Sequence, residues 1–321
     1  MQKTFLIVNL SFFGDVLLTN PLCQNLKTEY PDCKIVFLTN KPFVEVAKYQ
    51  KDVDDAIFLD KRKENKGFLG LIKFAYHCKY RNKIDVAFVV YGNPRGIIVS
   101  RLLGAKRVVA KPPKFIKFLV SDIPTGREPI KAQDINGHLF EGYAKKAEKV
   151  LPIKYLTNPK ESFIAKKIRE NYPNSTLIGL CCTSKCKSKD MLLEHAIEII
   201  NNLHTKGKTV LFFGSGQIAR NYADNIKKHG CTNFVDLTNI TSIYDLANLL
   251  SVCEKLISVD TGTMHLGYAV SCPTVCVFYQ NGPSKKWAPD EKLYNVKIIE
   301  NDITPEKIIE SMDKLPKKTL G

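Results

Sequence analysis

A polar turn between an apolar segment and a helical pattern is the part of this chain best suited to bind a phosphorylated ligand. Residues 256–259 are apolar and lead into Asp260, Thr261 and Gly262, and the helical pattern that follows carries His265. Backbone N–H groups at a helix start lack partners and attract anions, and glycine lets a ligand approach closely. The turn therefore predicts a diphosphate site. The alternative is that Asp260 only caps the helix and that His265 is a core residue.

A second polar loop, at residues 182–189, follows the apolar run 176–181. The loop contains three lysines together with hydroxyl and thiol groups, among them Thr183, Ser184 and Lys189. Lysine and hydroxyl donors neutralise phosphate charge. We therefore expect this loop to share a ligand with the Asp260 turn.

A glycine loop at residues 214–217 ends in Gln217 and could approach a nucleotide, although a tight turn alone explains either glycine.

No GxGxxG pattern follows the first predicted strand and no Walker motif occurs in the sequence, so the usual signals of dehydrogenases and P-loop enzymes are missing. Cys182, Cys186 and His195 lack the paired Cys-x-x-Cys spacing of a metal site. We expect no metal site formed by these residues and no required cofactor, and the sequence leaves dependence on a divalent metal open.

The candidate general base is Asp15, which follows Gly14 just after the first predicted strand. A carboxylate at the mouth of a ligand cleft can accept the proton of an incoming hydroxyl. The alternative is that Asp15 only caps the helix that begins there.

Alternating β-rich and amphipathic stretches predict an α/β fold with two Rossmann-like, doubly wound domains facing each other across a cleft, residues 1–155 and 156–321. Ligands of such sheets bind beyond the carboxyl ends of the strands. The polar run 152–173 is the expected linker and hinge, and the last helix could pack back on the N-terminal domain. Strands are expected at residues 4–9, 34–39, 55–59, 85–90, 107–110, 176–181, 209–214, 234–236, 255–259 and 274–278. Helices are expected at residues 16–29, 192–204, 219–229, 243–251, 264–270 and 304–312.

The positive charge is concentrated in the N-terminal half. Residues 1–155 contain 27 Lys and Arg against 15 Asp and Glu, which gives +12 of the chain's net +16. In the densest block, residues 61–83, apolar side chains recur at helical spacing (Phe68, Leu71, Ile72 and Ala75). This pattern predicts an interfacial helix on anionic lipid, and a second block at 106–117 adds Phe115 and Ile116. Candidate contacts are Lys61, Arg62, Lys63 and Lys73. The alternative is a solvated basic face.

Composition fits a globular protein of 321 residues, with 44% hydrophobic and 25% charged residues. The N-terminus has no signal-peptide pattern and no apolar run reaches the roughly 18 residues of a membrane span, so we expect a cytoplasmic protein. Most of the ten cysteines lie in or beside apolar segments, so we interpret them as reduced thiols.

The order of the motifs GDVLLTNPL, SKDMLLEH, LFFGSG, VDLTNITSIYDLANLL, SVDTGTMHLGYAV and PTVCVFYQNGPSKKWAP resembles that of the ADP-heptose:lipopolysaccharide heptosyltransferases. The resemblance runs from about residue 5 to residue 289. It implies two domains of the GT-B type and inverting transfer of L-glycero-D-manno-heptose from ADP-heptose to Kdo-lipid A or heptosyl-Kdo-lipid A, in the inner core of lipopolysaccharide.

The resemblance also implies roles for the candidate residues. Asp15 matches the catalytic base and Lys189 a lysine that contacts the donor phosphates, with Thr183 and Ser184 beside it. The residues matching the donor-binding turn are Asp260, Thr261, Gly262 and His265, while Gln217 lies near the position of a ribose contact. The chain departs from the family pattern in two places: Met191 and Leu192 replace a Trp-Pro pair, and Phe12 and Phe13 replace smaller residues.

The expected partners are a nucleotide-sugar donor and an anionic lipopolysaccharide precursor, with a monomer bound peripherally at the cytoplasmic face of the inner membrane. We expect no nucleic-acid partner, because RNA-binding aromatic signatures and a DNA-reading helix are missing from the sequence. Three alternatives stay open: an inverting transferase that uses another nucleotide sugar, a sugar-nucleotide epimerase, and a basic glycolipid-binding protein without catalysis.

Overall fold

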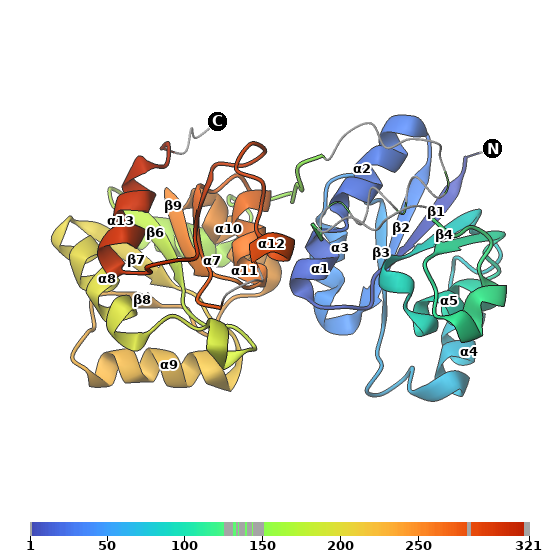
Figure 1. Ribbon diagram of the computed structural model, residues 1–321, viewed down its shortest axis with the longest axis horizontal. Coiled ribbons are helices and arrows are strands. Elements are labelled where there is room, and N and C mark those ends of the chain that lie inside the picture. The colour runs from blue at the N-terminus through green and yellow to red at the C-terminus, as the bar shows by residue number, and fades with distance from the viewer. Residues whose placement is uncertain are drawn as a thin grey trace. The chain divides into compact units, whose positions relative to one another are not determined.

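The chain forms two compact units, residues 1–154 and 155–321, which divide next to the boundary placed from the sequence. The structure, a computed structural model, describes residues 2–124, 131–132, 134, 139, 143, 151–280 and 284–317. Each unit contains one parallel β-sheet between helices (Figure 1).

The N-terminal sheet has the strand order β3-β2-β1-β4-β5, and all of its neighbouring pairs are parallel. Its strands are β1 (Thr4–Val8), β2 (Lys34–Asn40), β3 (Asp55–Leu59), β4 (Val86–Val89) and β5 (Arg107–Ala110). The helices are α1 (Phe13–Leu17), α2 (Asn20–Glu29), α3 (Val44–Lys48), α4 (Gly67–His77) and α5 (Pro94–Leu102), with the 3₁₀ helices η1 (Lys41–Phe43), η2 (Val90–Gly92) and η3 (Lys114–Leu119). All five predicted strands of this half are confirmed.

The prediction of one helix over residues 16–29 is wrong, because α1 and α2 are separate helices. Pro21 stands in the first turn of α2. Proline has no N–H to donate within a continuing helix, whereas at a helix start no partner is needed. Because of this break, the short helix α1, which carries Asp15, is separate from α2 and directly follows β1.

The C-terminal sheet has the order β11-β10-β9-β6-β7-β8 and is also parallel throughout. Its strands are β6 (Thr176–Cys181), β7 (Lys208–Phe212), β8 (Val235–Asp236), β9 (Lys255–Val259), β10 (Thr274–Val277) and β11 (Val296–Ile299). Its helices are α7 (Phe163–Asn171), α8 (Leu193–Thr205), α9 (Gly216–Lys228), α10 (Ile243–Val252), α11 (Gly262–Ala269), α12 (Ser284–Trp287) and α13 (Pro305–Lys314), with the 3₁₀ helix η4 (Lys187–Lys189). The edge strand β11 was missed, because four residues that include an exposed Lys297 give little apolar pattern.

The run 152–173 contains the observed boundary between the units, but the prediction of a linker is wrong for residues 163–171, because α7 occupies them. The Ser162 hydroxyl accepts from the Ala165 N–H and so caps this helix. Ala165 and Ile168 are buried, and Arg169 donates to the Val252 carbonyl at the end of α10 at 2.9 Å. The surrounding lysines hid this short apolar stripe in the sequence.

The last helix, α13, packs within the C-terminal unit against α8 and strands β9 to β11. Ile308, Ile309 and Met312 join the core formed with α8 and α9. The apolar face of α13 is therefore used inside its own unit.

All ten cysteines are free thiols, and the seven that were placed in or beside apolar segments are buried, as predicted. Burial raises the pKa of several of these thiols, including Cys182, far above the ordinary value. Among the residues that the structure describes, no helix is long and apolar enough to cross a membrane.

Candidate functional site

Each sheet has one position where its strand order reverses, and the candidate residues follow the strands that flank these two positions. In the N-terminal sheet the reversal lies between β1 and β4, and in the C-terminal sheet between β6 and β9. Loops at the carboxyl ends of strands part at such a switch point, which leaves a crevice where ligands bind. The parallel topology thus places Asp15 at one switch point, and Lys189 and Asp260 at the other.

Asp15 is half-buried in the first turn of α1, just beyond β1. Its Oδ2 accepts the Phe12 N–H at 3.2 Å, and its Oδ1 accepts the Tyr91 hydroxyl at 3.1 Å. Tyr91 follows β4, so this second bond crosses the switch point. The capping alternative describes only the Phe12 contact, and Tyr91 holds the other carboxylate oxygen.

Two side chains that were not identified from the sequence donate hydrogen bonds to the backbone carbonyl of Asp15. Asn9, which is fully buried at the end of β1, donates from Nδ2 to the Asp15 carbonyl at 3.0 Å and to the Thr19 Oγ1 at 2.9 Å. The Thr19 hydroxyl donates to the same carbonyl at 2.9 Å. An asparagine ending an apolar strand is the signal that could have revealed this frame, since a buried amide must find partners.

Tyr91 and Gly92 both have left-handed backbone conformations, with φ of 58° and 57°. This region is unfavourable for tyrosine, so the turn stores strain, and such strain gathers at functional sites. At Gly92 a Cβ atom would lie 1.9 Å from the Lys111 carbonyl oxygen, so only glycine fits there. The crowded turn aims the Tyr91 hydroxyl at Asp15.

In the C-terminal unit, Lys189 and Asp260 form an ion pair across the switch point. The Lys189 Nζ donates to the Asp260 Oδ2 at 2.7 Å, although 71 residues separate the two in sequence. The Asp260 side chain is only 7% exposed. Water screens this pair weakly, so each group fixes the other.

A second carboxylate orders the lysine loop and was missed from the sequence. Asp190 Oδ1 accepts the Ser184 N–H at 2.7 Å, and burial raises the pKa of its carboxyl above the ordinary value. The Met191 N–H donates to the Cys182 carbonyl at 2.9 Å and closes the base of the loop. Met191 is buried against the Cys182 thiol, so the departure from Trp-Pro here places an apolar side chain in the core.

The remaining polar candidates of this unit differ in exposure. Thr183 is buried, whereas Ser184 is half-buried and its hydroxyl donates to the Cys186 carbonyl at 2.8 Å. Gln217 is exposed in the first turn of α9, where its Nε2 donates to Asn221 Oδ1 at 2.8 Å. The hydrogen bond that Gln217 forms with Asn221 therefore involves neither Lys189 nor Asp260.

Helix α11 begins directly after the Asp260 turn, and Thr261 occupies its N-cap position. Asp260 is therefore not the cap of this helix, since its carboxylate is paired with Lys189. Thr261 and Gly262 are half-exposed at the helix start, where backbone N–H groups point outward. This end of α11 retains the anion-binding geometry that the sequence predicted.

His265 lies inside the C-terminal unit and is only 4% exposed. Its Nδ1 shares a hydrogen bond with the Tyr268 hydroxyl. Burial lowers the pKa of His265 from 6.5 to about 4, and the nearby Asp260 carboxylate opposes that shift only in part. The imidazole is therefore neutral at pH 7, and the core alternative describes its position.

The four basic candidates of the N-terminal unit fall into two places. Lys61 lies near the Asp15 loop, since its Nζ donates to the Leu10 carbonyl at 3.4 Å. Burial, and then the neighbouring Arg95, lower the pKa of Lys61. Arg62 and Lys63 are exposed in the turn after β3, and Lys73 is exposed on α4. Of the four, Lys61 is thus the one whose side chain contacts the segment that leads to Asp15.

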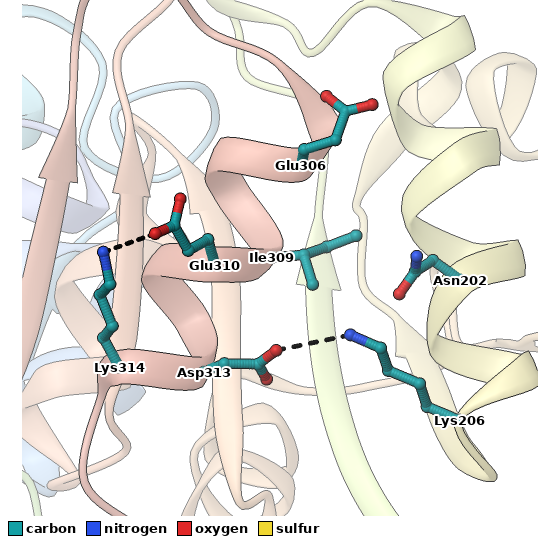
Figure 2. A pocket seen from close by; sticks show the side chains of 7 residues that line it. All are labelled: Asn202, Lys206, Glu306, Ile309, Glu310, Asp313 and Lys314. Carbon is teal, nitrogen blue, oxygen red and sulfur yellow. Dashed lines mark hydrogen bonds and ion pairs between the residues drawn. The ribbon is translucent and has the colours of Figure 1, made fainter.

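A groove of about 490 Å³ lies between the end of α8 and α13, away from the candidate residues (Figure 2). Four of its charged residues form two ion pairs, Lys206 with Asp313 at 3.4 Å and Lys314 with Glu310 at 2.6 Å. The end of α8 faces the amino edge of the sheet, opposite the ligand loops. In the described part of the chain, no group of three or more His, Cys, Asp or Glu residues could hold a metal ion.

Two parallel, doubly wound sheets with polar loops at their switch points are the architecture of GT-B glycosyltransferases. Residues 138–316 match the model of glycosyltransferase family 9 (heptosyltransferase), which is more than half of the chain. The chain therefore belongs to glycosyltransferase family 9, the heptosyltransferases.

Individual relatives cover nearly the whole chain at low identity. The lipooligosaccharide heptosyltransferase 2 of Haemophilus influenzae is 22% identical over 97% of this chain and 98% of its own length. A family 9 glycosyltransferase from Veillonella parvula is 18% identical, with a TM-score of 0.88 over 98% of this chain and 97% of that chain. The ADP-heptose lipopolysaccharide heptosyltransferase II of E. coli is 17% identical, with a TM-score of 0.80 over 98% of both chains. At these identities the two structures establish the shared fold alone.

Proposed function

We propose that this chain transfers L-glycero-D-manno-heptose from ADP-heptose to the inner core of a lipopolysaccharide precursor, with inversion at the anomeric carbon. The observation that carries the proposal is the Lys189–Asp260 ion pair at the start of α11. It brings a phosphate-binding cation and a helix N-terminus to one edge of one sheet. The names of two relatives, lipooligosaccharide heptosyltransferase 2 and ADP-heptose lipopolysaccharide heptosyltransferase II, support the choice of donor.

The diphosphate of the donor would lie at the Thr261–Gly262 helix start and against Lys189. An ammonium group has three N–H donors, and the Asp260 contact uses one of them. The other two are available to phosphate oxygens, so Asp260 acts as the residue that positions Lys189. As the bond from the anomeric carbon to the phosphate oxygen breaks, the charge that develops on ADP is stabilised by these donors.

Asp15 would act as the general base. Its carboxylate accepts the proton of an acceptor hydroxyl while the hydroxyl oxygen forms the new bond to the anomeric carbon and ADP departs from the opposite face. A single displacement of this kind inverts the configuration. The Tyr91 and Phe12 donors fix the orientation of the carboxylate.

The acceptor would be Kdo-lipid A or heptosyl-Kdo-lipid A, which carry carboxylate and phosphate groups. Lys61 is the best placed of the basic candidates to meet such an anion, because it lies beside the loop that carries Asp15. Arg62 and Lys63 follow in the same turn and would contact the acceptor or the anionic surface of the cytoplasmic face of the inner membrane. A monomer is sufficient for this arrangement.

The test is incubation with ADP-heptose and truncated core acceptors, followed by mass measurement of the products. We expect an acceptor heavier by one heptose unit and an equal amount of ADP. Turnover of donor without any acceptor would instead indicate an epimerase. Transfer from another nucleotide sugar alone would overturn the choice of donor, and absence of ADP release with every acceptor would favour a non-catalytic glycolipid-binding protein.

Replacement of the base gives the second test. Asp15→Asn should reduce transfer by about a thousandfold or more while ADP binding stays close to that of the wild type. Asp32→Asn, at an exposed carboxylate in the same unit, is the matched control and should be fully active. Near-normal turnover of Asp15→Asn would refute the assignment of the base.

A further inference from the structure

The exposed apolar side chains of the N-terminal unit are concentrated on two short elements, α4 and η3. Six of the thirteen large apolar side chains exposed in the described part of the chain lie there. Leu69 is 79% exposed and Phe118 is 81% exposed. We call these six residues the α4–η3 surface: Phe68, Leu69, Ile72 and Tyr76 from α4, and Phe115 and Phe118 from η3.

Both elements cover the same face of the N-terminal sheet. Leu71 and Ala75 of α4 and Ile116 of η3 enter one core cluster, which also contains Ile97 of α5. Helix α5 packs against both elements. Their inner faces are therefore satisfied by the core, and the six exposed side chains are additional to what folding requires.

Lysines lie among these apolar side chains. Lys66, Lys73, Lys114 and Lys117 are exposed and form no ion pair with any residue that the structure describes. Glu64 is the one acidic residue between positions 61 and 83, and positions 106–117 contain none. Aromatic and aliphatic side chains interleaved with unpaired lysines fit the boundary between the headgroups and acyl chains of an anionic bilayer.

The position of these elements relates them to the candidate base. Helix α4 follows the carboxyl end of β3 and η3 follows that of β5, and Asp15 lies beyond the same edge of the sheet, after β1. The basic turn that precedes α4 begins with Lys61, which contacts the Leu10 carbonyl near Asp15. A lipid surface at α4 and η3 would therefore border the candidate acceptor region.

We propose that the α4–η3 surface inserts its apolar side chains into an anionic membrane and so docks the enzyme beside its lipid-linked acceptor. The inference rests on the proposed function for the identity of that acceptor, whereas insertion itself depends only on the surface. A purely electrostatic contact would need the lysines alone. The exposed Leu69, Phe115 and Phe118 add an apolar contribution that salt does not screen.

Vesicle sedimentation tests the surface. We expect the full chain to bind vesicles of phosphatidylethanolamine with phosphatidylglycerol and to bind phosphatidylcholine vesicles far less. The double variant Leu69→Ser, Phe118→Ser should bind the anionic vesicles about tenfold less or weaker still. Phe163→Ser, at an exposed phenylalanine on α7 in the other unit, is the matched control and should bind like the wild type. Equal binding by the double variant and the wild type, or no binding by the wild type, would overturn the proposal.

Leu69→Trp measures insertion directly, with the wild type as the correction for Trp287. Its added fluorescence should shift to the blue on anionic vesicles and be quenched by lipids brominated in the acyl chain. Binding without any shift would show a contact made by charge alone and would also overturn the proposal.

Transfer activity separates this inference from the proposed function. On a water-soluble, delipidated acceptor without vesicles, the Leu69→Ser, Phe118→Ser variant should turn over like the wild type, which also shows that it is folded. Loss of its turnover on this acceptor would assign the two residues to the active site and refute a docking role. If the wild type has no transferase activity but inserts into anionic vesicles, the proposed function fails and the membrane surface stands.

Discussion

Acidification should destabilise the C-terminal unit through His265, and the structure gives the size of the effect. The imidazole is buried beside Tyr268, and its pKa is lowered from 6.5 to about 4. In the unfolded chain the same histidine binds a proton below pH 6.5, whereas in the folded chain it stays neutral until the pH approaches 4. The unfolded state therefore gains protons first as the pH falls, and the stability that the neutral imidazole contributes is lost in this interval.

The loss of stability at about pH 5 depends little on the pKa of His265 in the folded state. At pH 5, about 1.5 pH units below 6.5, His265 is protonated in the unfolded chain and neutral in the folded chain. Because each unit corresponds to about 1.4 kcal/mol, the free energy of unfolding is lower by about 2 kcal/mol than at pH 7.5. Any folded-state pKa well below 5 gives nearly the same figure. His265→Gln removes this titration, so the variant should lose about 2 kcal/mol less than the wild type between the two pH values.

The assay is urea unfolding followed by the fluorescence of Trp287, the single tryptophan of the chain, which lies in the same unit as His265. Its signal follows the C-terminal unit even where the N-terminal unit unfolds separately. Comparing each protein with itself at two pH values cancels the loss that the substitution causes at neutral pH. Equal pH-dependent losses in the wild type and in His265→Gln, within about 0.5 kcal/mol, would refute a buried, neutral His265.

Two further predictions concern the contacts across the switch points. Lys189→Met should lower kcat/KM for the donor by about a hundredfold and Asp260→Asn by about tenfold, because the first removes a phosphate donor and the second only its positioning partner. Lys187→Met, in the same loop, should change kcat/KM for the donor less than about threefold. If Lys187→Met lowered kcat/KM as much as Lys189→Met, the donor would be bound by the charge of the loop in general and not by Lys189. Tyr91→Phe should lower kcat about tenfold with the donor KM unchanged, measured by ADP release, and an unchanged kcat would show that Asp15 does not need this hydroxyl.

The fold could be predicted from the sequence because the strands of a parallel sheet are buried on both faces and read as apolar runs. β2 and β9 are buried along almost their entire length and were predicted close to their observed bounds. α7 and β11 were missed for the opposite reason. They bury only a few side chains among polar neighbours, so neither stands out in the sequence as an apolar run.

The candidate loops could be predicted, but their partners could not. Apolar strands followed by Asp15, Lys189 or Asp260 mark the carboxyl edge of each sheet. Nothing in the sequence indicates that Lys189 and Asp260 pair, because that depends on β6 and β9 being neighbours after a crossover. The same holds for Tyr91, because its contact with Asp15 depends on β1 and β4 being neighbours after a crossover.

The two switch-point contacts have different consequences for an incoming ligand. The Asp15 carboxylate accepts the Phe12 and Tyr91 donors on different oxygens, which fixes its orientation before a hydroxyl arrives. Lys189 must share its charge between Asp260 and the diphosphate. Because Asp260 is nearly buried, losing its partner entirely would leave a costly unpaired charge. The donor is therefore expected to bind beside the ion pair rather than to replace it, which is why Asp260→Asn should weaken donor binding rather than strengthen it.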